Sequence, residues 1–127
     1  MIVRYTTPST TIRAAKVEGL VRLPDMRILA HEIELRLTPD VVCVVVDLRE
    51  VEVLADAALV AALRGVRNVM KRRAGRLVLV ARDVRLARLS RLAARDDVLL
   101  VCASPAEALD DRNVRAEATA TAAAAAR

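Results

Sequence analysis

Residues 41–63 read VVCVVVDLREVEVLADAALVAAL, and the hydrophobic pattern changes its period within this stretch. Valines surround Cys43 without a polar interruption, which is typical of a strand buried on both faces of a parallel sheet. This strand is predicted to end at Asp47, and a charged connector with Arg49, Glu50 and Glu52 follows it. A helix is then predicted to begin near Asp56, because apolar residues recur at helical spacing. These residues are Leu59, Ala62, Leu63, Val66 and Met70.

Asp56 stands where this helix is predicted to begin. The N–H groups of a first helical turn lack partners within the helix and carry partial positive charge, so an anion is stabilised there. In one interpretation, Asp56 is an N-cap that stabilises its own helix by about 1 kcal/mol. In the other, the connection between strand and helix is a recognition point for another molecule.

The order of these residues resembles a STAS domain, the fold of the anti-sigma factor antagonists. Members of that family run from a buried strand into Asp-Leu-Ser-Gly. After a short apolar stretch, they continue into Asp-Ser-Ser/Thr-Gly-Leu at the start of a helix. The corresponding residues here are Asp47-Leu48-Arg49-Glu50 and Ala55-Asp56-Ala57-Ala58-Leu59. The resemblance implies that the second segment is a partner-binding loop and helix start.

The chain departs from the family's phosphorylation motif. Asp56 takes the position of the phosphorylated serine, Ala55 that of the preceding aspartate and Ala58 that of the glycine. No Ser or Thr lies between Thr38 and Ser90, so this loop cannot be phosphorylated in the family's usual way. A carboxylate carries one permanent negative charge where phosphoserine carries nearly two. Asp56 is therefore expected either to mimic the phosphorylated state or to suit a partner adapted to an acidic loop.

The rest of the chain alternates between predicted strands and helices. Further strands are predicted at residues 2–5, 11–21, 77–81 and 98–102. Helices are predicted at residues 24–37, 56–73, 84–92 and 105–109. This alternation indicates an α/β fold with a mixed, mostly parallel sheet of four to five strands. The resemblance implies in addition that the strands lie in sequential order and that the helices lie mainly on one face.

Local signals refine these elements. A turn is predicted at residues 6–9, and Gly19 is expected to mark a bulge or bend in its strand. Gly75 is expected to end the Asp56 helix in the left-handed conformation. In the helix at residues 84–92, four apolar side chains are available for packing, namely Val84, Leu86, Leu89 and Leu92.

The chain of 127 residues has the length of one domain, predicted at residues 1–111 and followed by an Ala-rich tail at residues 112–127. No apolar run approaches the roughly 20 residues that cross a bilayer, and the N-terminus lacks the apolar region of a signal peptide. A cytoplasmic location is therefore expected. Cys43 and Cys102 lie in predicted buried strands. With the sequential order that the resemblance implies, a third strand separates them by about 9–10 Å, so both should stay reduced.

Positive charge is concentrated in one region. Eleven Lys and Arg residues lie between Arg64 and Arg95 against a single acid, Asp83, whereas the whole chain carries a net charge of +5. Such a region could attract an acidic protein, a nucleic acid or an anionic membrane. Alternatively, the arginines keep the outer faces of two helices soluble while their stems cover apolar side chains. The second interpretation is favoured, because no aromatic residues are interspersed to stack bases.

The sequence gives little support for catalysis. It contains no glycine-rich dinucleotide or phosphate motif and no nucleophile elbow, and His31 has no acidic or thiol partner at helical spacing. The acids Asp47, Glu50, Glu52 and Asp56 are interpreted as a solvated loop and a cap rather than as an acid–base pair. No enzyme activity, cofactor or metal ion is expected.

The sequence therefore predicts a regulatory protein-binding domain. The resemblance implies that its partner is an anti-sigma factor of the serine-kinase type, and that Asp56 removes control by phosphorylation. Two alternatives remain open. One is an accessory STAS-like subunit of a membrane transporter, and the other is nucleic-acid binding through residues 64–95. Self-association is a further possibility on which the sequence gives no direction.

Overall fold

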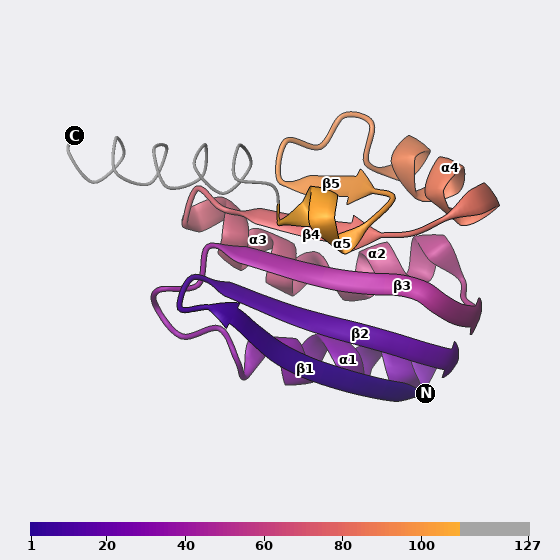
Figure 1. Ribbon diagram of the computed structural model, residues 1–127, viewed down its shortest axis with the longest axis horizontal. Helices are drawn as coiled ribbons and strands as arrows, with labels where there is room; N and C mark the ends of the chain where they lie inside the picture. Colours follow the sequence, from indigo (N-terminus) through magenta and orange to yellow (C-terminus); the bar gives the residue numbers. More distant parts are fainter. Residues whose placement is uncertain (110–127) are drawn as a thin grey trace.

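A five-stranded sheet forms the centre of the molecule, and its strands lie in sequence order (Figure 1). The computed structural model describes residues 1–109, so the predicted tail at residues 112–127 lies outside the described residues. The strands are β1 (Ile2–Ser9), β2 (Ile12–Leu20), β3 (Cys43–Val53), β4 (Arg76–Val80) and β5 (Leu99–Cys102). β1 pairs with β2 antiparallel, and every later pair is parallel. The predicted fold class is confirmed.

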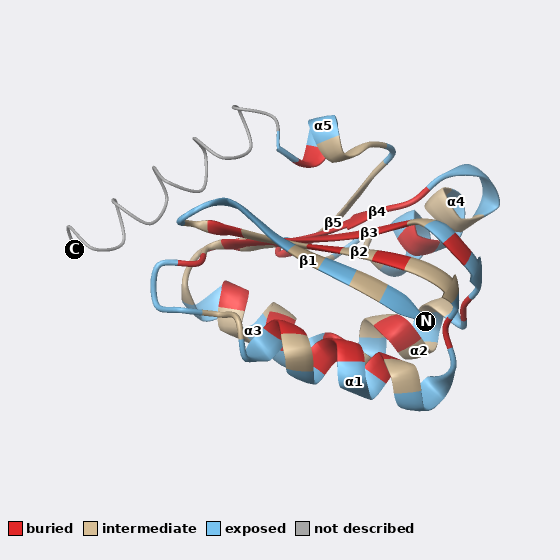
Figure 2. Ribbon diagram, turned by 60° about the horizontal axis from the view of Figure 1, so that its bottom comes forward, coloured by how far each residue is buried: buried red, intermediate tan, exposed pale blue. Residues whose placement is uncertain are grey.

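The helices connect the parallel strands and gather mainly on one face of the sheet. They are α1 (Leu23–Glu34), α2 (Asp56–Ala62), α3 (Arg64–Arg72), α4 (Asp83–Leu92) and α5 (Pro105–Ala108). Figure 2 shows α1, α2 and α3 beneath the sheet, with α5 on the opposite side. α4 shares the larger core with them through Leu89. The predicted distribution of helices is therefore confirmed, with the short α5 as the exception.

The valine-rich start of β3 is buried on both faces, as its continuous apolar pattern predicts. Val44 and Val46 belong to the larger core between the sheet and α1, α2, α3 and α4. Cys43 and Val45 belong to a smaller cluster on the other face, where Ala108 of α5 also lies. β3 lies between β2 and β4 and anchors both layers.

β3 is longer than predicted. The prediction ended the strand at Asp47 and placed a charged connector after it, but the strand continues to Val53 and pairs with β2 as far as Leu20. Val51 is buried, whereas Glu50 and Glu52 are exposed, so this part alternates in the manner of a half-buried strand. Charged residues on its open face do not interrupt the backbone pairing. Only Leu54 and Ala55 separate the strand from α2.

The single helix predicted at residues 56–73 is divided into α2 and α3 at Leu63, whose φ of −85° and ψ of 5° leave the helical region. Leu59, Leu63, Val66 and Met70 are all buried. The bend at Leu63 therefore occurs without removing either half of this apolar stripe from the core. Helical spacing alone does not reveal such a break, because the stripe continues across it.

The end of α3 corrects the assignment of the left-handed residue. Ala74, not Gly75, adopts positive φ, at 54°. The Gly75 N–H donates to the Met70 carbonyl at 2.8 Å and the Ala74 N–H to the Lys71 carbonyl at 3.2 Å, the hydrogen bonds of a Schellman motif. Glycine is needed at residue 75 for a different reason, because a Cβ there would collide with the Val42 carbonyl.

The N-terminal hairpin also departs from one expectation. The predicted turn at residues 6–9 is wrong, because β1 remains extended to Ser9 with a register shift after Thr6. The reversal lies at Thr10 and Thr11. The expected irregularity at Gly19 is confirmed: its φ is 87°, and the register with β3 shifts between Gly19 and Leu20.

Candidate functional site

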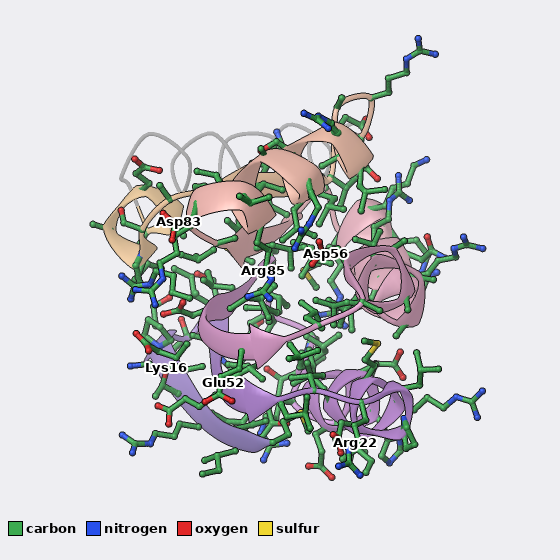
Figure 3. All side chains as sticks on the ribbon, turned by 90° about the vertical axis from the view of Figure 1, so that its right-hand side faces the viewer. Lys16, Arg22, Glu52, Asp56, Asp83 and Arg85 are labelled. Atoms are coloured by element: carbon green, nitrogen blue, oxygen red, sulfur yellow. The ribbon has the colours of Figure 1, made fainter. Side chains whose placement is uncertain are left out.

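The candidate site lies where β3 passes into α2, at the edge of the sheet formed by the carboxyl ends of its parallel strands (Figure 3). Ala55 is the N-cap in an extended conformation, and its side chain cannot cap the helix. Asp56 is the first residue of α2, so the predicted helix start is confirmed, but the interpretation of Asp56 as the N-cap is wrong. A carboxylate in this first turn interacts favourably with the positive end of the helix dipole.

Two arginines of α4 hold the Asp56 carboxylate. Its Oδ2 accepts a hydrogen bond from Arg88 Nε at 2.5 Å, and its Oδ1 lies 3.4 Å from Arg85 Nε. Only 9% of the Asp56 side chain is exposed. Arg85 is fixed further, because its Nη1 donates to the Val51 carbonyl at 2.8 Å. The carboxylate is therefore neutralised within the molecule and is not an open acidic tip.

This ion-pair cluster is only partly satisfied. Asp56 Oδ1 and Arg85 Nε are buried, and neither makes a hydrogen bond of acceptable geometry. Their separation still allows strong Coulomb attraction, yet a buried polar atom without a hydrogen bond costs free energy. Incomplete satisfaction of this kind is uncommon in native structures and requires an explanation at the site where it occurs.

The five predicted site residues differ in what they offer a partner. Ala55 and Ala57 are exposed, Ala58 is partly buried against the core, and Asp56 is largely covered. Leu59 is fully buried, so its side chain holds α2 against the sheet and is not available for partner contact. The surface at the start of α2 consists of small side chains beside the α4 arginines.

Asp47, the residue that matches the aspartate of the family's first motif, is the buried charged residue of the described core and lies within β3, so its interpretation as part of a solvated loop is wrong. The Arg49 side chain binds its carboxylate with two hydrogen bonds, from Nε to Oδ1 and from Nη2 to Oδ2, each at 3.0 Å, and the Arg49 backbone N–H donates to Oδ1 at 3.1 Å. Burial raises the pKa of Asp47, but the hydrogen bonds from Arg49 outweigh burial and leave the pKa lowered. Arg49 therefore stabilises a charged Asp47 within the sheet.

Sequence reasoning missed Arg85 and Arg88 as partners of Asp56. It assigned the arginines of this segment to an outer, solvated face. A signal was present, since Arg82, Arg85, Arg88 and Arg91 recur every three residues and must therefore occupy more than one face of the helix. The pairing with Asp56 could not be predicted from local sequence patterns, because about thirty residues separate Asp56 from these arginines in the chain.

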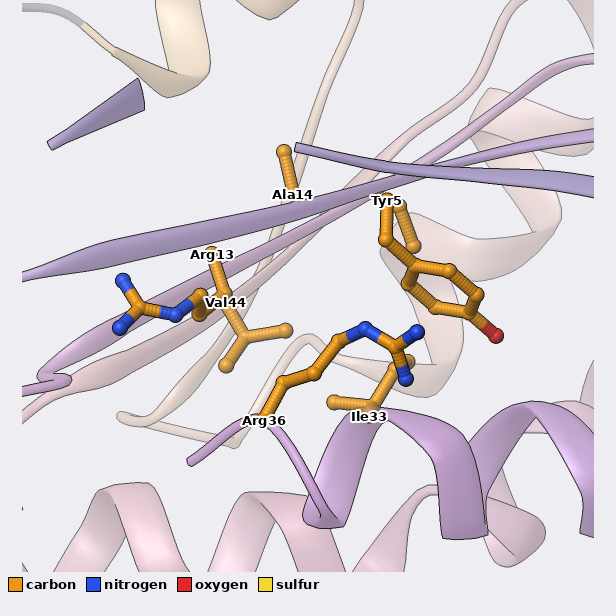
Figure 4. Close-up of a pocket in the computed structure, with 7 residues that line it drawn as sticks. Tyr5, Arg13, Ala14, Ile33, Arg36 and Val44 are labelled. Atoms are coloured by element: carbon orange, nitrogen blue, oxygen red, sulfur yellow. The ribbon is translucent and has the colours of Figure 1, made fainter. Parts of the chain in front are cut away.

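One small cavity and two open hollows are lined by described residues, and none of these three encloses a ligand-sized space. A cavity of about 10 Å³ lies between β1, β2, β3 and the end of α1, where Arg36 stacks 3.8 Å from the centroid of the Tyr5 ring (Figure 4). That volume holds at most one water molecule. Two larger hollows, of about 430 and 490 Å³, are open to solvent.

The remaining chemistry of the described residues is limited. Residues 1–109 contain no group of three or more His, Cys, Asp or Glu placed to hold a metal ion. In the same range, no helix is long and apolar enough to cross a membrane. Cys43 lies on β3 and Cys102 on β5, and β4 separates these two strands. Burial raises the pKa of the Cys102 thiol.

Comparison with solved structures finds the same arrangement of sheet and helices. The anti-sigma factor antagonist SpoIIAA in its unphosphorylated form superposes with a TM-score of 0.70 over 91% of this chain and 97% of that one, at 12% sequence identity. The chain has the STAS-like fold of the anti-sigma factor antagonists. The phosphorylated form of SpoIIAA, a Bacillus cell fate determinant, gives a TM-score of 0.65 at 11% identity, covering 86% of this chain and 97% of that one.

An anti-sigma factor antagonist from Mycobacterium paratuberculosis shares the STAS-like fold, with a TM-score of 0.67 and 18% identity over 85% of this chain and 90% of that one. No family model and no curated protein sequence matches the chain. At such low identity, the likeness establishes the STAS-like fold alone.

Proposed function

We propose that this chain is a non-catalytic regulatory domain that binds an anti-sigma factor of the serine-kinase type. The STAS-like fold over most of the chain supports this function, since each of the three structures compared belongs to an anti-sigma factor antagonist. The proposed contact surface is the start of α2, where Ala55 and Ala57 are exposed.

The position of Asp56 carries the regulatory part of the proposal. Its carboxylate stands at the helix start with two arginines as counter-ions. A phosphoserine there would add nearly two negative charges and alter docking by charge and bulk. In this chain the charge is permanent and internally paired, so binding is independent of kinase activity.

Binding to the anti-sigma factor is tested directly by isothermal titration calorimetry. The probe is a serine-kinase anti-sigma factor encoded in the genome that supplies this chain. We expect saturable binding that Ala57→Arg weakens by at least about tenfold, because a long charged side chain would stand in the contact surface. Ala61→Arg, at an exposed residue one turn further along α2, is the matched control. Absence of binding to any such kinase would contradict the proposed function.

Kinase independence is tested with the same pair of proteins and ATP. We expect mass spectrometry to find no phosphate on residues 47–59, and the affinity to be the same with and without ATP turnover. Asp56→Ser restores a hydroxyl at this position, and Asp56→Ala controls for the loss of charge. Phosphorylation of the serine variant alone would support the proposed role of residue 56, whereas phosphate on the unchanged loop would refute it.

A further inference from the structure

The outer face of α4 carries apolar side chains that the sequence assigned to packing. Val84 and Leu92 were expected to pack, but they are 66% and 47% exposed, whereas Leu89 is fully buried. Val84, Arg88 and Leu92 follow one another at intervals of four residues and so form a single stripe along the helix. We refer to this stripe together with Arg91 as the α4 outer face.

Arginines surround this stripe. The segment from residue 82 to residue 95 contains five arginines and one acid, Asp83. Arg85 and Arg88 bind Asp56, but within residues 1–109 no ion pair or hydrogen bond involves the side chains of Arg82, Arg91 and Arg95, all of which are exposed. Half of the Arg88 side chain is also exposed. The α4 outer face is therefore both apolar and strongly cationic.

The cluster at Asp56 joins this face to the start of α2. Because Arg88 lies in the stripe and donates to Asp56 Oδ2, the exposed Ala57 and the α4 outer face belong to one continuous region of the surface. Figure 3 shows Arg85 of α4 reaching toward Asp56 across this edge of the sheet. A partner that contacts the start of α2 would also meet α4.

We propose that the α4 outer face docks an acidic amphipathic helix of a protein partner. Val84 and Leu92, two helical turns apart, match leucine-like side chains eight residues apart on such a helix, and its carboxylates match the arginines between and beside these two anchors. Nucleic acid fits less well, because a phosphate backbone gains nothing from the two exposed apolar side chains. In addition, the only aromatic residue of the chain is Tyr5, which lies in β1 and whose ring is covered by Arg36, so α4 offers no ring on which a base could stack. The inference deepens the proposed function by naming the chemistry of the partner's contact segment.

The first test uses the anti-sigma factor as the probe and compares paired variants. Val84→Ser with Leu92→Ser removes the apolar anchors, and Arg91→Glu with Arg95→Glu reverses the flanking charge. Matched controls are Leu23→Ser with Leu35→Ser, at exposed leucines of α1 and its end, and Lys71→Glu with Arg72→Glu, at exposed cations of α3. We expect each α4 pair to weaken binding by about tenfold or more, and each control pair to change it less than about threefold. All replaced side chains are exposed, and circular dichroism checks the fold.

The second test removes dependence on the proposed function. Its probe is a synthetic helical peptide of leucine and glutamate with leucines eight residues apart on one face, compared with a scrambled peptide of the same composition and with duplex DNA. We expect chemical-shift changes on α4 with the ordered peptide, weaker changes with the scrambled one, and loss of both in the Val84→Ser, Leu92→Ser variant. This result supports the α4 inference even if no anti-sigma factor binds.

Two results would overturn the inference while leaving the proposed function intact. One is unchanged affinity for the anti-sigma factor in both α4 variants. The other is tighter binding of duplex DNA than of the ordered peptide, with the arginine variants affected and the serine variants unaffected, which would assign the face to nucleic acid. If neither the anti-sigma factor nor the ordered peptide binds, both proposals fail.

Discussion

Asp96, which precedes β5, is held by Arg67 of α3, and Asp56 of α2 is held by two arginines of α4, but their hydrogen bonding differs. Asp96 accepts from Arg67 Nε at 2.7 Å and Nη2 at 3.2 Å, and from the backbone N–H groups of Val98 and Leu99 at 2.8 and 2.9 Å. Asp56 accepts one hydrogen bond from Arg88, while its Oδ1 faces Arg85 without one. Both carboxylate oxygens of Asp96 therefore accept hydrogen bonds, whereas only one oxygen of Asp56 does.

The difference in hydrogen bonding indicates that the two aspartate–arginine clusters do not stabilise the fold equally. The Asp96 cluster ties α3 to the start of β5 and satisfies every oxygen, as expected of a group that stabilises the fold. The Asp56 cluster lies at the start of α2 beside exposed small and apolar side chains, and keeps part of its hydrogen-bonding capacity. Because these unsatisfied atoms are buried, they should make the Asp56 cluster the weaker of the two in stabilising the fold.

The largest expected effect is that of Asp96→Asn on stability. This variant removes the charge that Arg67 binds and places an NH₂ group where one oxygen accepts, so we expect the free energy of unfolding to fall by about 2 kcal/mol. Urea unfolding followed by circular dichroism measures it. A loss no greater than that of Asp97→Asn, at the exposed neighbouring residue, would remove the contrast between the two clusters.

Acid sensitivity should depend on the same residue. Burial raises the pKa of Asp96, but the hydrogen bonds from Arg67, Leu99 and Val98 outweigh it and lower the pKa to about 2, from an ordinary 3.8. Because the folded pKa is depressed, this stabilisation is complete above about pH 4 and is lost as the pH falls toward 2. Unfolding free energies across this range should fall less steeply in Asp96→Asn than in the unchanged chain. If the free energy of unfolding fell equally steeply with pH in both proteins, Asp96 would not be the residue that controls the loss of stability in acid.

Asp56→Asn should cost less, about 1 kcal/mol. Arg85 keeps its hydrogen bond to the Val51 carbonyl, and the half-exposed Arg88 can turn to water. The same urea titration measures this loss, and hydrogen exchange of α4 amides should increase because α4 loses its tie to α2. A loss as large as that of Asp96→Asn would make the Asp56 cluster a structural one.

The smallest expected effect is that of Arg88→Ala, about 0.5 kcal/mol or less, since the Arg88 side chain is half exposed and Arg85 remains beside the Asp56 carboxylate. Arg67→Ala should cost about 1–2 kcal/mol, because it leaves the saturated Asp96 without its bidentate partner. A double-mutant cycle for each pair isolates the coupling energy. Coupling of Arg88 to Asp56 that equals that of Arg67 to Asp96 would contradict the ranking.

Much of the fold could be predicted because its signals are local. The valines around Cys43 indicated a strand buried on both faces, and a helix was predicted at residues 105–109, directly after Ser104. Ser104 Oγ does accept from the Glu107 N–H, at 3.2 Å. The extension of β3 to Val53 and the break at Leu63 escaped prediction, because pairing with β2 and packing against the core decide them.

The sequence by itself determined the alternation of strands and helices, the place of Asp56 at a helix start and the absence of a hydroxyl in its loop, since these depend on residue types close together in the chain. Only the tertiary structure decided what surrounds that carboxylate. Arg85 and Arg88 reach Asp56 because the parallel strands bring α4 beside α2, and the same packing leaves Val84 and Leu92 exposed. Contacts between residues about thirty positions apart depend on how the layers pack, and no local pattern encodes them.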